Sequence, residues 1–400
     1  MRVAVVGGGI GGLAAANALW RRGIDVEVYE QAPELGEIGA GVLMTPNSLR
    51  ALERMGMREA LAAVGATISN GSSYYRADGT KIAPILTTDS SGWNGMYGMH
   101  RADLLAVLAD ALPSSRVHTG RRLVEFAQDE SGCVLTFDDG SSATADVVVA
   151  ADGIKSTLQH YVARPAQPIN SGSVAYRGLV PIERIPSWRN TTSQLWMGDG
   201  KHFLVYPVRS GSMINYVAFV PSDSITDESW SAPGDIGALR DAFAGWDPLV
   251  GDLLACVDAT YWWGLYDREP LETWTNGRLT LLGDAAHPML PHLGQGANQA
   301  IEDGVALAVH LSSADPSSPE EALAAYEAQR RARTTAVQEG ARANGRRYDS
   351  HFDDLSERDA EITASTSFRS WLYDYDVEQE AFELTANPST VALGQGSCNG

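Results

Sequence analysis

The residues best suited to hold a phosphate group lie at the start of the chain. Gly7, Gly9 and Gly12 have the GxGxxG spacing, after a β-branched run and before an Ala- and Leu-rich stretch at 13–22. Such a turn brings the backbone close to a pyrophosphate, and the following helix points its free N–H groups at the phosphates. Glu30 ends a second predicted strand, residues 25–29, where an acidic side chain can bind a ribose hydroxyl. The spacing predicts a dinucleotide-binding strand–turn–helix unit.

A second glycine-rich segment follows a later apolar strand. This strand leads to Asp284, which can accept hydrogen bonds from ribityl hydroxyls, and Gly294, Gly296, Ala297 and Asn298 then form a turn at a predicted helix start. Backbone N–H groups and the positive end of a helix dipole stabilise the negative charge that reduced flavin carries near N1 and the C2 carbonyl. This order of residues indicates FAD more specifically than a GxGxxG turn does.

Together with Asp152, in the pattern DGxxS at 152–156, these motifs resemble those of the group A flavoprotein aromatic hydroxylases related to salicylate hydroxylase and 3-hydroxybenzoate 6-hydroxylase. The resemblance runs from residue 1 to about residue 345. It implies one noncovalent FAD, reduced by NADH or NADPH and then oxidised by O2 to a C4a-hydroperoxide that hydroxylates a small, phenolic aromatic substrate.

The resemblance also implies roles for single residues near the cofactor. It places Arg101, at a predicted helix start, against the FAD pyrophosphate or ribityl chain, and Asp152 near both FAD and the nicotinamide pathway. The family often has an arginine seven residues beyond this aspartate, where this chain has Gln159.

Two histidines are candidates for the base that accepts the substrate's phenolic proton. His202 and Tyr206 are four residues apart in a predicted strand, so they point to one face, and the resembled enzymes place a histidine base here. Histidine suits this role because its ordinary pKa is near 6.5. His292, in the loop along the flavin, is the alternative base or a substrate anchor, and Pro288 is expected to shape the cavity.

A carboxylate on the substrate would need a cation, for which three candidates lie nearby in the sequence: Lys201, Arg177 and Arg209. His287 is expected to be structural, at the turn after Asp284.

The segment between these motifs changes from helical spacing to short alternating strands, which predicts an antiparallel sheet. The expected fold class is α/β, with a Rossmann-like FAD-binding domain interrupted by a sheet-based substrate domain and followed by C-terminal helices. The expected boundaries are 1–70, 98–170 and 275–345 for the FAD domain, 71–97 and 171–274 for the substrate domain, 346–386 for a helical segment, and 387–400 for a disordered tail.

The composition narrows the possible partners. Fifty acidic against thirty basic residues give a net charge of -20, which repels nucleic acid and anionic lipid surfaces. Three cysteines are too few and too scattered for a disulfide framework or a zinc site, so no metal is expected. No apolar stretch is long enough for a membrane span. We expect a cytoplasmic monomer or homodimer.

Other functions fit part of this pattern. An FAD-dependent reductase or dehydrogenase would not use O2 productively, and a hydroxylase could act on a non-phenolic heteroaromatic such as an indole. A non-catalytic protein could keep FAD for structure alone. A flavin halogenase is disfavoured because the chain has no WxWxIP motif.

Overall fold

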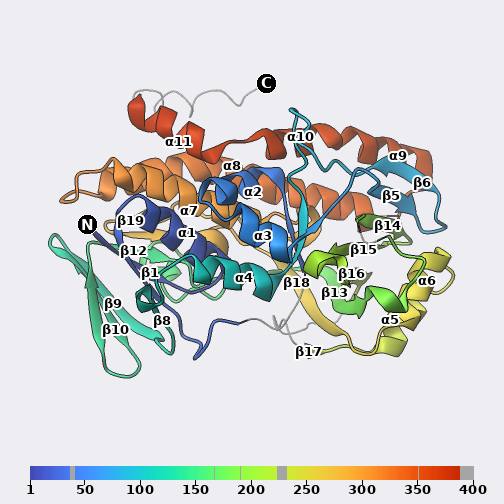
Figure 1. Cartoon of the computed structure of the whole chain (residues 1–400), viewed down its shortest axis with the longest axis horizontal. Coiled ribbons are helices and arrows are strands. Elements are labelled where there is room, and N and C mark those ends of the chain that lie inside the picture. The colour runs from blue at the N-terminus through green and yellow to red at the C-terminus, as the bar shows by residue number, and fades with distance from the viewer. Residues whose placement is uncertain (37–40, 166, 190, 223–231, 350, 388–400) are drawn as a thin grey trace.

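The computed structural model describes residues 1–36, 41–165, 167–189, 191–222, 232–349 and 351–387. The two largest sheets lie side by side, and helices cover them (Figure 1). This arrangement confirms the predicted α/β class with C-terminal helices. Nearly all of the predicted disordered tail, residues 388–400, lies outside the described residues.

The cofactor-side half is built on a six-stranded sheet in the order β19-β20-β12-β1-β2-β8. Neighbouring strands are parallel except β19 and β20. The central strands are Val-rich and buried, as is typical of parallel strands covered by helices. In sheet order the strands are Thr275–Asn276, Leu279–Leu281, Val147–Ala150, Arg2–Val6, Asp25–Tyr29 and Val117–His118.

Two smaller sheets adjoin this half. Strands β11 (Ser142–Ala145), β10 (Gly132–Phe137) and β9 (Leu123–Asp129) form one, and β3 (Gly41–Met44), β7 (Tyr97–His100) and β4 (Ala66–Thr67) form the other. The helices of this half are α1 (Ile10–Arg21), α2 (Pro46–Arg54), α3 (Arg58–Val64), α4 (Arg101–Asp110) and α7 (Gly296–Ser312).

Helices α1 and α7 pack closely on each other. A Cβ added at Gly304 of α7 would lie 2.7 Å from the Cα of Ala15 in α1, so the crossing depends on a glycine at this position. The contact places the N-termini of the two helices at one cavity, although they are almost 290 residues apart in the chain.

The second half is an eight-stranded sheet in the order β17-β18-β13-β16-β15-β14-β5-β6, antiparallel except for β14 with β5. Helices α5 (Ile236–Ala242) and α6 (Pro248–Ala255) belong to this half. In sheet order the strands are Ala232–Pro233, Tyr261–Asp267, Ile169–Pro181, Met213–Pro221, Lys201–Val208, Gln194–Gly198, Ser73–Arg76 and Lys81–Pro84.

Alternation along β15 divides the apolar residues of this sheet between its two faces. Phe203 and Val205 pack into an apolar cluster with side chains of α5 and α6. His202, Leu204 and Tyr206 point to the opposite face, because successive side chains of a strand alternate. That face is turned toward the cofactor-side half.

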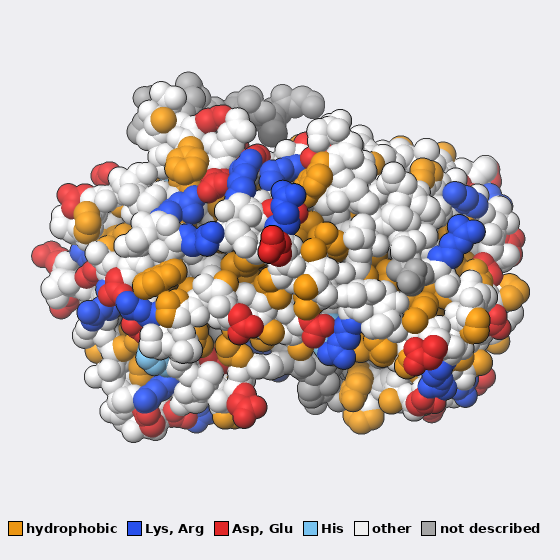
Figure 2. All heavy atoms as spheres, viewed as in Figure 1, with side chains coloured by type: hydrophobic (Ala, Val, Ile, Leu, Met, Phe, Trp, Pro, Cys, Tyr) orange, Lys and Arg blue, Asp and Glu red, His pale blue; other side chains and the backbone are white. Residues whose placement is uncertain are grey.

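The 30-residue helix α8 (Glu320–Asp349) connects the two halves (Figure 1). It contacts α7 on the cofactor side and β14 and β15 on the substrate side. Helices α9 (Leu355–Ala364), α10 (Thr366–Asp374) and α11 (Val377–Ala386) follow it. No helix among the described residues combines the length and apolarity that crossing a membrane requires. Acidic and basic side chains are interspersed on the face shown in Figure 2.

A buried ionic network joins α7 to α8. Glu302 accepts hydrogen bonds from Arg330 and Arg333, and Asp303 accepts from Arg330, His287 and the backbone N–H of Gly283. Arg330, Glu302 and Asp303 have no exposed side-chain surface. Burial opposes ionisation of the two carboxyls, but the neighbouring cations outweigh it and lower the pKa of each.

The C-terminal aromatic segment packs onto this network. Arg333 donates to the carbonyl of Leu372, and its guanidinium lies 3.6 Å from the centre of the Tyr375 ring. Asp376 forms an ion pair with Arg54 of α2. The Tyr375 ring of this segment and the Asp376 that follows it therefore contact other elements of the same chain.

We expect Arg330→Met to lower the free energy of unfolding by about 3 to 5 kcal/mol, because it leaves buried carboxylates without one of their cations. Arg331→Met is the matched control, since this neighbouring side chain is 40% exposed and forms an ion pair with Glu327 one helical turn away. Urea titration of both variants measures the difference. Equal stability of the two variants would contradict the importance of the network.

Candidate active site

A cavity of about 310 Å³ lies where the two halves meet. Segments far apart in the sequence form its wall: the turn after β1, strand β3, the start of α4, the turn after β12, strands β13, β15, β16 and β18, and the loop from Leu282 to Ala297. Of the predicted site residues, it is lined by Gly9, Arg101, Tyr206, Asp284, Pro288, Gly294, Gly296 and Ala297.

Two helix N-termini face this cavity. Gly9 is the N-cap residue of α1, and α7 starts at Gly296 after Gln295; neither cap supplies a side-chain hydrogen bond to the helix. The first backbone N–H groups of a helix have no partner within it and carry its positive dipole end. Both ends can therefore bind anionic or carbonyl oxygen atoms of a cofactor.

The glycines of the first turn are required by close approach. A Cβ at Gly7, where φ is +110°, would lie 2.2 Å from the carbonyl oxygen of Ala151, and one at Gly12 would lie 2.0 Å from the carbonyl oxygen of Gly7. A Cβ at Gly9 would meet nothing within 4 Å. Gly7 and Gly12 thus allow the turn to pack, and Gly9 leaves space over the helix N-terminus for a phosphate.

The acidic residues expected near the cofactor occupy different settings. Glu30 accepts hydrogen bonds from the backbone N–H groups of Gly8 and Ala32, at 2.6 and 2.8 Å, which fixes its carboxylate beside the glycine turn. Asp152 accepts from Thr157 and does not line the cavity. Asp284 lines the cavity with an exposed carboxylate. Of the three, Asp284 has the setting expected of a ribityl ligand.

Asn298 has a structural role within the described residues. Its side chain accepts from the backbone N–H of Thr45 and donates to the carbonyl oxygens of Leu43 and Gly294. These bonds attach the start of α7 to strand β3. The Asn298 side chain therefore fixes the start of α7, where Gly296 and Ala297 line the cavity.

These residues fit FAD. Open N–H groups at two helix starts, the cradle above Gly9, the cation of Arg101 and the carboxylate of Asp284 surround one cavity. They would hold the pyrophosphate, the ribityl chain and the flavin of this cofactor.

The substrate-side wall is mostly apolar. Leu204, Val217, Phe219 and Trp263 line it. Tyr206 is buried here, and burial raises the pKa of its hydroxyl although the nearby Arg177 opposes this. An apolar wall with a few polar groups is typical of a site for a small aromatic ligand.

Arg177 is the one of the three candidate carboxylate anchors that lines this cavity. It is buried, and its guanidinium lies 5.0 Å from the centre of the Trp263 ring. Lys201 instead donates to the carbonyl of Ala242, and Arg209 pairs with Asp103. The structure therefore distinguishes Arg177 from Lys201 and Arg209 as the carboxylate anchor, which the sequence alone does not.

His202 and His292 lie together, one layer outside the cavity. The ring of His202 stacks on Phe219, with centroids 3.9 Å apart and an interplanar angle of 10°, and its centroid is 5.3 Å from that of His292. Neither histidine lines the cavity, whereas Phe219 does. His202 Nδ1 is 2.5 Å from a carboxylate oxygen of Asp349, the last residue of α8.

Electrostatics distinguishes the two histidines. Burial, reinforced by repulsion from His202, lowers the pKa of His292 to about 3, and Asp349 only partly opposes this. A general base works best when its pKa lies near the working pH, so His292 is a poor proton acceptor. The base role stays a prediction, and the surroundings favour His202.

Other expected residues hold the flavin loop. His287 hydrogen-bonds Asp303, as expected of a structural turn residue. Pro288 lines the cavity, and its carbonyl accepts from Gln338 of α8. Gln159, where the family often has arginine, is buried and donates to the carbonyl of Ala285. A neutral amide thus fastens the loop that carries Asp284.

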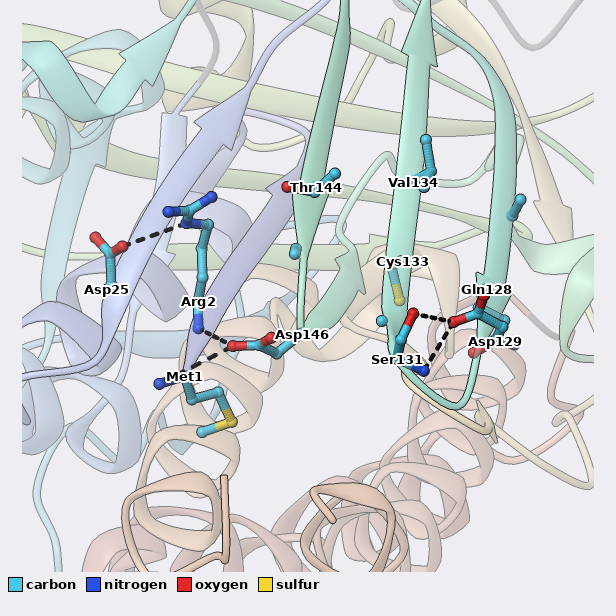
Figure 3. A pocket seen from close by; sticks show the side chains of 13 residues that line it. Met1, Arg2, Asp25, Gln128, Asp129, Ser131, Cys133, Val134, Thr144 and Asp146 are labelled. Carbon is cyan, nitrogen blue, oxygen red and sulfur yellow. Dashed lines mark hydrogen bonds and ion pairs between the residues drawn. The ribbon is translucent and has the colours of Figure 1, made fainter. Parts of the chain in front are cut away.

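A hollow of about 600 Å³ lies elsewhere, beside the N-terminus (Figure 3). Its carboxylates are engaged: Asp146 accepts from the backbone N–H of Arg2, Asp25 pairs with the Arg2 side chain, and Asp129 accepts from Ser131. Burial raises the pKa of the Cys133 thiol to about 12, so no reactive thiolate forms there. This hollow offers no activated group.

Sequence reasoning missed Asp349, Phe219 and Trp263. Strand alternation could have placed Phe219 on the cavity face, because it pairs with His202 across β15 and β16. Asp349 lies far beyond the motifs in the sequence, and no pattern in its neighbouring residues marks it as a site residue.

We expect Glu30→Ala to weaken FAD binding about 10- to 100-fold, because the carboxylate that orders the glycine turn and is expected to bind the ribose is lost. Flavin fluorescence during reconstitution of the deflavinated protein measures this. Glu34→Ala, at an exposed position four residues on, should bind FAD like the unmodified chain. Equal affinity of both variants would remove Glu30 from the site.

The low pKa of His292 predicts acid sensitivity. Between pH 7 and pH 5 the unfolded chain takes up a proton at this residue and the folded chain does not, so stability falls by about 2 kcal/mol as the pH falls. His292→Gln should lose correspondingly less stability over this range. His351→Gln, at an exposed position, should keep the original dependence, and urea unfolding at both pH values tests the pair.

Comparison with known proteins supports FAD as the cofactor. A family model for an FAD binding domain matches residues 1–341. The 3-amino-4-hydroxybenzoate 2-monooxygenase of Streptomyces cremeus is 38% identical over 384 residues, covering 93% of this chain and 95% of that protein. The salicylate hydroxylase of Pseudomonas putida is 33% identical over 425 residues, covering 96% and 95%. A solved salicylate hydroxylase substrate complex has a TM-score of 0.82 at 31% identity, covering 96% of this chain and 98% of that one. The chain therefore belongs to the family of FAD-dependent aromatic hydroxylases.

Proposed function

We propose that this monooxygenase hydroxylates a small aromatic ring that carries both a hydroxyl group and a carboxylate, using NADH or NADPH and O2. The observation that carries the proposal is a buried cation, Arg177, in the mostly apolar substrate wall. The names of two relatives, a 3-amino-4-hydroxybenzoate monooxygenase and a salicylate hydroxylase, describe substrates of this class.

The charge of Arg177 explains how an anionic substrate could enter a chain with a net charge of -20. A planar guanidinium binds a carboxylate with two parallel hydrogen bonds, and it does so more strongly in a site that excludes water. The Trp263 ring beside it offers a flat surface to the guanidinium. We infer that the carboxylate end of the substrate lies at Arg177.

The other residues of the wall orient the ring. Leu204, Val217 and Phe219 supply apolar contacts, and the Tyr206 hydroxyl can donate a hydrogen bond to an oxygen on the ring. Bound FAD, once reduced by NAD(P)H, supplies the activated oxygen from O2. An electron-rich ring reacts best with such oxygen, so loss of the phenolic proton assists the reaction.

His202 is the residue that we propose as acceptor of this proton. It shares the strand face of Leu204 and Tyr206, and it packs against Phe219 of the cavity wall. The alternative, His292, is disfavoured by its low pKa.

A reductase that does not use O2 productively is separated from a hydroxylase by a direct measurement. The purified holoenzyme is supplied with NADH or NADPH and a panel of salicylate, hydroxybenzoates, hydroxynicotinates and indoles. The proposal expects a hydroxy-carboxylate to stimulate NAD(P)H oxidation, with product identified by mass in proportion to the O2 consumed. Stimulation only by indoles, or hydrogen peroxide as the sole product, would overturn it.

We expect Arg177→Met to raise the KM for the best carboxylate substrate about 10- to 100-fold, because a charged hydrogen-bond pair is lost. The same variant should change the KM of the matching methyl ester less than threefold. Arg184→Met, at a surface ion pair with Asp258, serves as the control. Equal losses for acid and ester would remove Arg177 as the anchor.

A further inference from the structure

We propose that Asp349 is a positioning residue for the proton-accepting His202, a role that rests on the function proposed above. In this assignment the N–H at Nδ1 of His202 donates a hydrogen bond to the Asp349 carboxylate, so that the lone pair of the ring lies on Nε2. The carboxylate also balances the positive charge of His202 after proton transfer.

The contact itself carries the first step of the argument. His202 Nδ1 and Asp349 Oδ1 are 2.5 Å apart, and the histidine is 1% exposed. A carboxylate oxygen accepts and cannot donate when ionised, so the shared proton belongs to the imidazole. A hydrogen bond to one ring nitrogen determines which nitrogen is left without a proton.

The surroundings leave the His202 ring little freedom to turn away. One face stacks on Phe219, and Tyr348 lies with its ring centre 5.1 Å away. Within the described residues, Asp349 is the only carboxylate within ion-pair distance of His202. A buried imidazolium is stable only beside such a counter-charge.

The neighbouring His292 does not compete for the proton. Burial lowers the pKa of His292 to about 3, so this imidazole stays neutral at ordinary pH. The Asp349 side chain is 19% exposed, whereas that of His202 is 2% exposed. The pair therefore links a buried base to the solvent on the side of α8.

The same three side chains could suggest a metal site, since their ligand atoms lie within 4.8 Å of one another. Two ligand atoms bound tetrahedrally to one zinc ion at about 2.1 Å would be about 3.4 Å apart. The 2.5 Å separation of His202 Nδ1 and Asp349 Oδ1 is that of a hydrogen bond. The spacing favours a shared proton over a shared ion.

The proton step balances without another reactant. Because His202 does not line the cavity, the transfer runs through one water. The phenolic O–H bond breaks and its electron pair stays on the substrate oxygen, the water takes this proton and gives up another, and an N–H bond forms at His202 Nε2. The resulting imidazolium faces the Asp349 carboxylate. The proton is later released to water on the exposed side of the pair.

The test compares Asp349→Ala and Asp349→Asn in the holoenzyme, with Asp353→Asn as an exposed aspartate control. Nitrogen-15 NMR of labelled histidine, assigned through His202→Ala, reports which ring nitrogen carries the proton. We expect the unmodified enzyme to hold the Nδ1–H form and Asp349→Ala to lose it. FAD content and the rate of flavin reduction by NAD(P)H should stay within twofold.

In Asp349→Ala the rate of hydroxylation should fall without a matching loss of substrate binding. We expect kcat for product formation to fall about 100-fold in Asp349→Ala, the lower end of what a general base contributes, with KM changed less than threefold. The oxygen that is still consumed should appear as hydrogen peroxide. Asp349→Asn keeps an oxygen acceptor without the charge, so it should keep more of the Nδ1–H form while still losing kcat.

The outcomes separate this inference from the proposed function. An unchanged His202 tautomer in Asp349→Ala overturns the positioning role whatever the activity. If His202→Ala loses coupled hydroxylation and Asp349→Ala does not, the inference alone is wrong. If neither variant loses it while substrate is still hydroxylated, the proposed base is wrong, and with it the role of Asp349 in catalysis.

Discussion

The structure depends most on a pair of adjacent carboxylates that have no contact with water. Burial raises the pKa of both Glu302 and Asp303 of α7, but Arg333 and Arg330 of α8 lower that of Glu302, and His287 and Arg330 lower that of Asp303, so that the net shift is downward for each. Through Asp303 the network also holds the N–H of Gly283 and the ring of His287, which fix the loop that presents Asp284. Removing charge here would disturb the cofactor wall as well as the core, because one Asp303 oxygen binds the loop and the other binds Arg330.

The cavity combines two kinds of wall that come from different secondary structures. Helix starts on one side offer N–H groups and positive dipole ends, which suit phosphate and reduced flavin. Alternating strand residues on the other side offer apolar surface, with Tyr206 and Arg177 as polar exceptions. A parallel sheet with crossover helices supplies the first wall, and an antiparallel sheet the second. This division explains why the fold joins two sheet types in one chain.

The sequence predicts the parts of this molecule that local chemistry determines. Sequence spacing alone predicts the glycine turns at Gly9 and Gly296 and the position of Asp284. It can do so because tight turns and helix starts permit few residue types. The depth of His202 and His292 could not be predicted, since it depends on how Phe219 and the end of α8 pack around them. Likewise Arg177 and Lys201 look equivalent in sequence, and only their position in the sheet separates them.

The length of helix α8 sets the distance between its contacts with the two halves of the molecule. Arg330 anchors it to the cofactor half and Asp349 reaches the substrate half, 19 residues later. At about 1.5 Å per residue these points are about 28 Å apart. One residue inserted between them would turn Asp349 about 100° around the helix axis and advance it by about 1.5 Å. The number of residues between Arg330 and Asp349 therefore matters as much as their identity, because an insertion within the helix would take Asp349 away from His202.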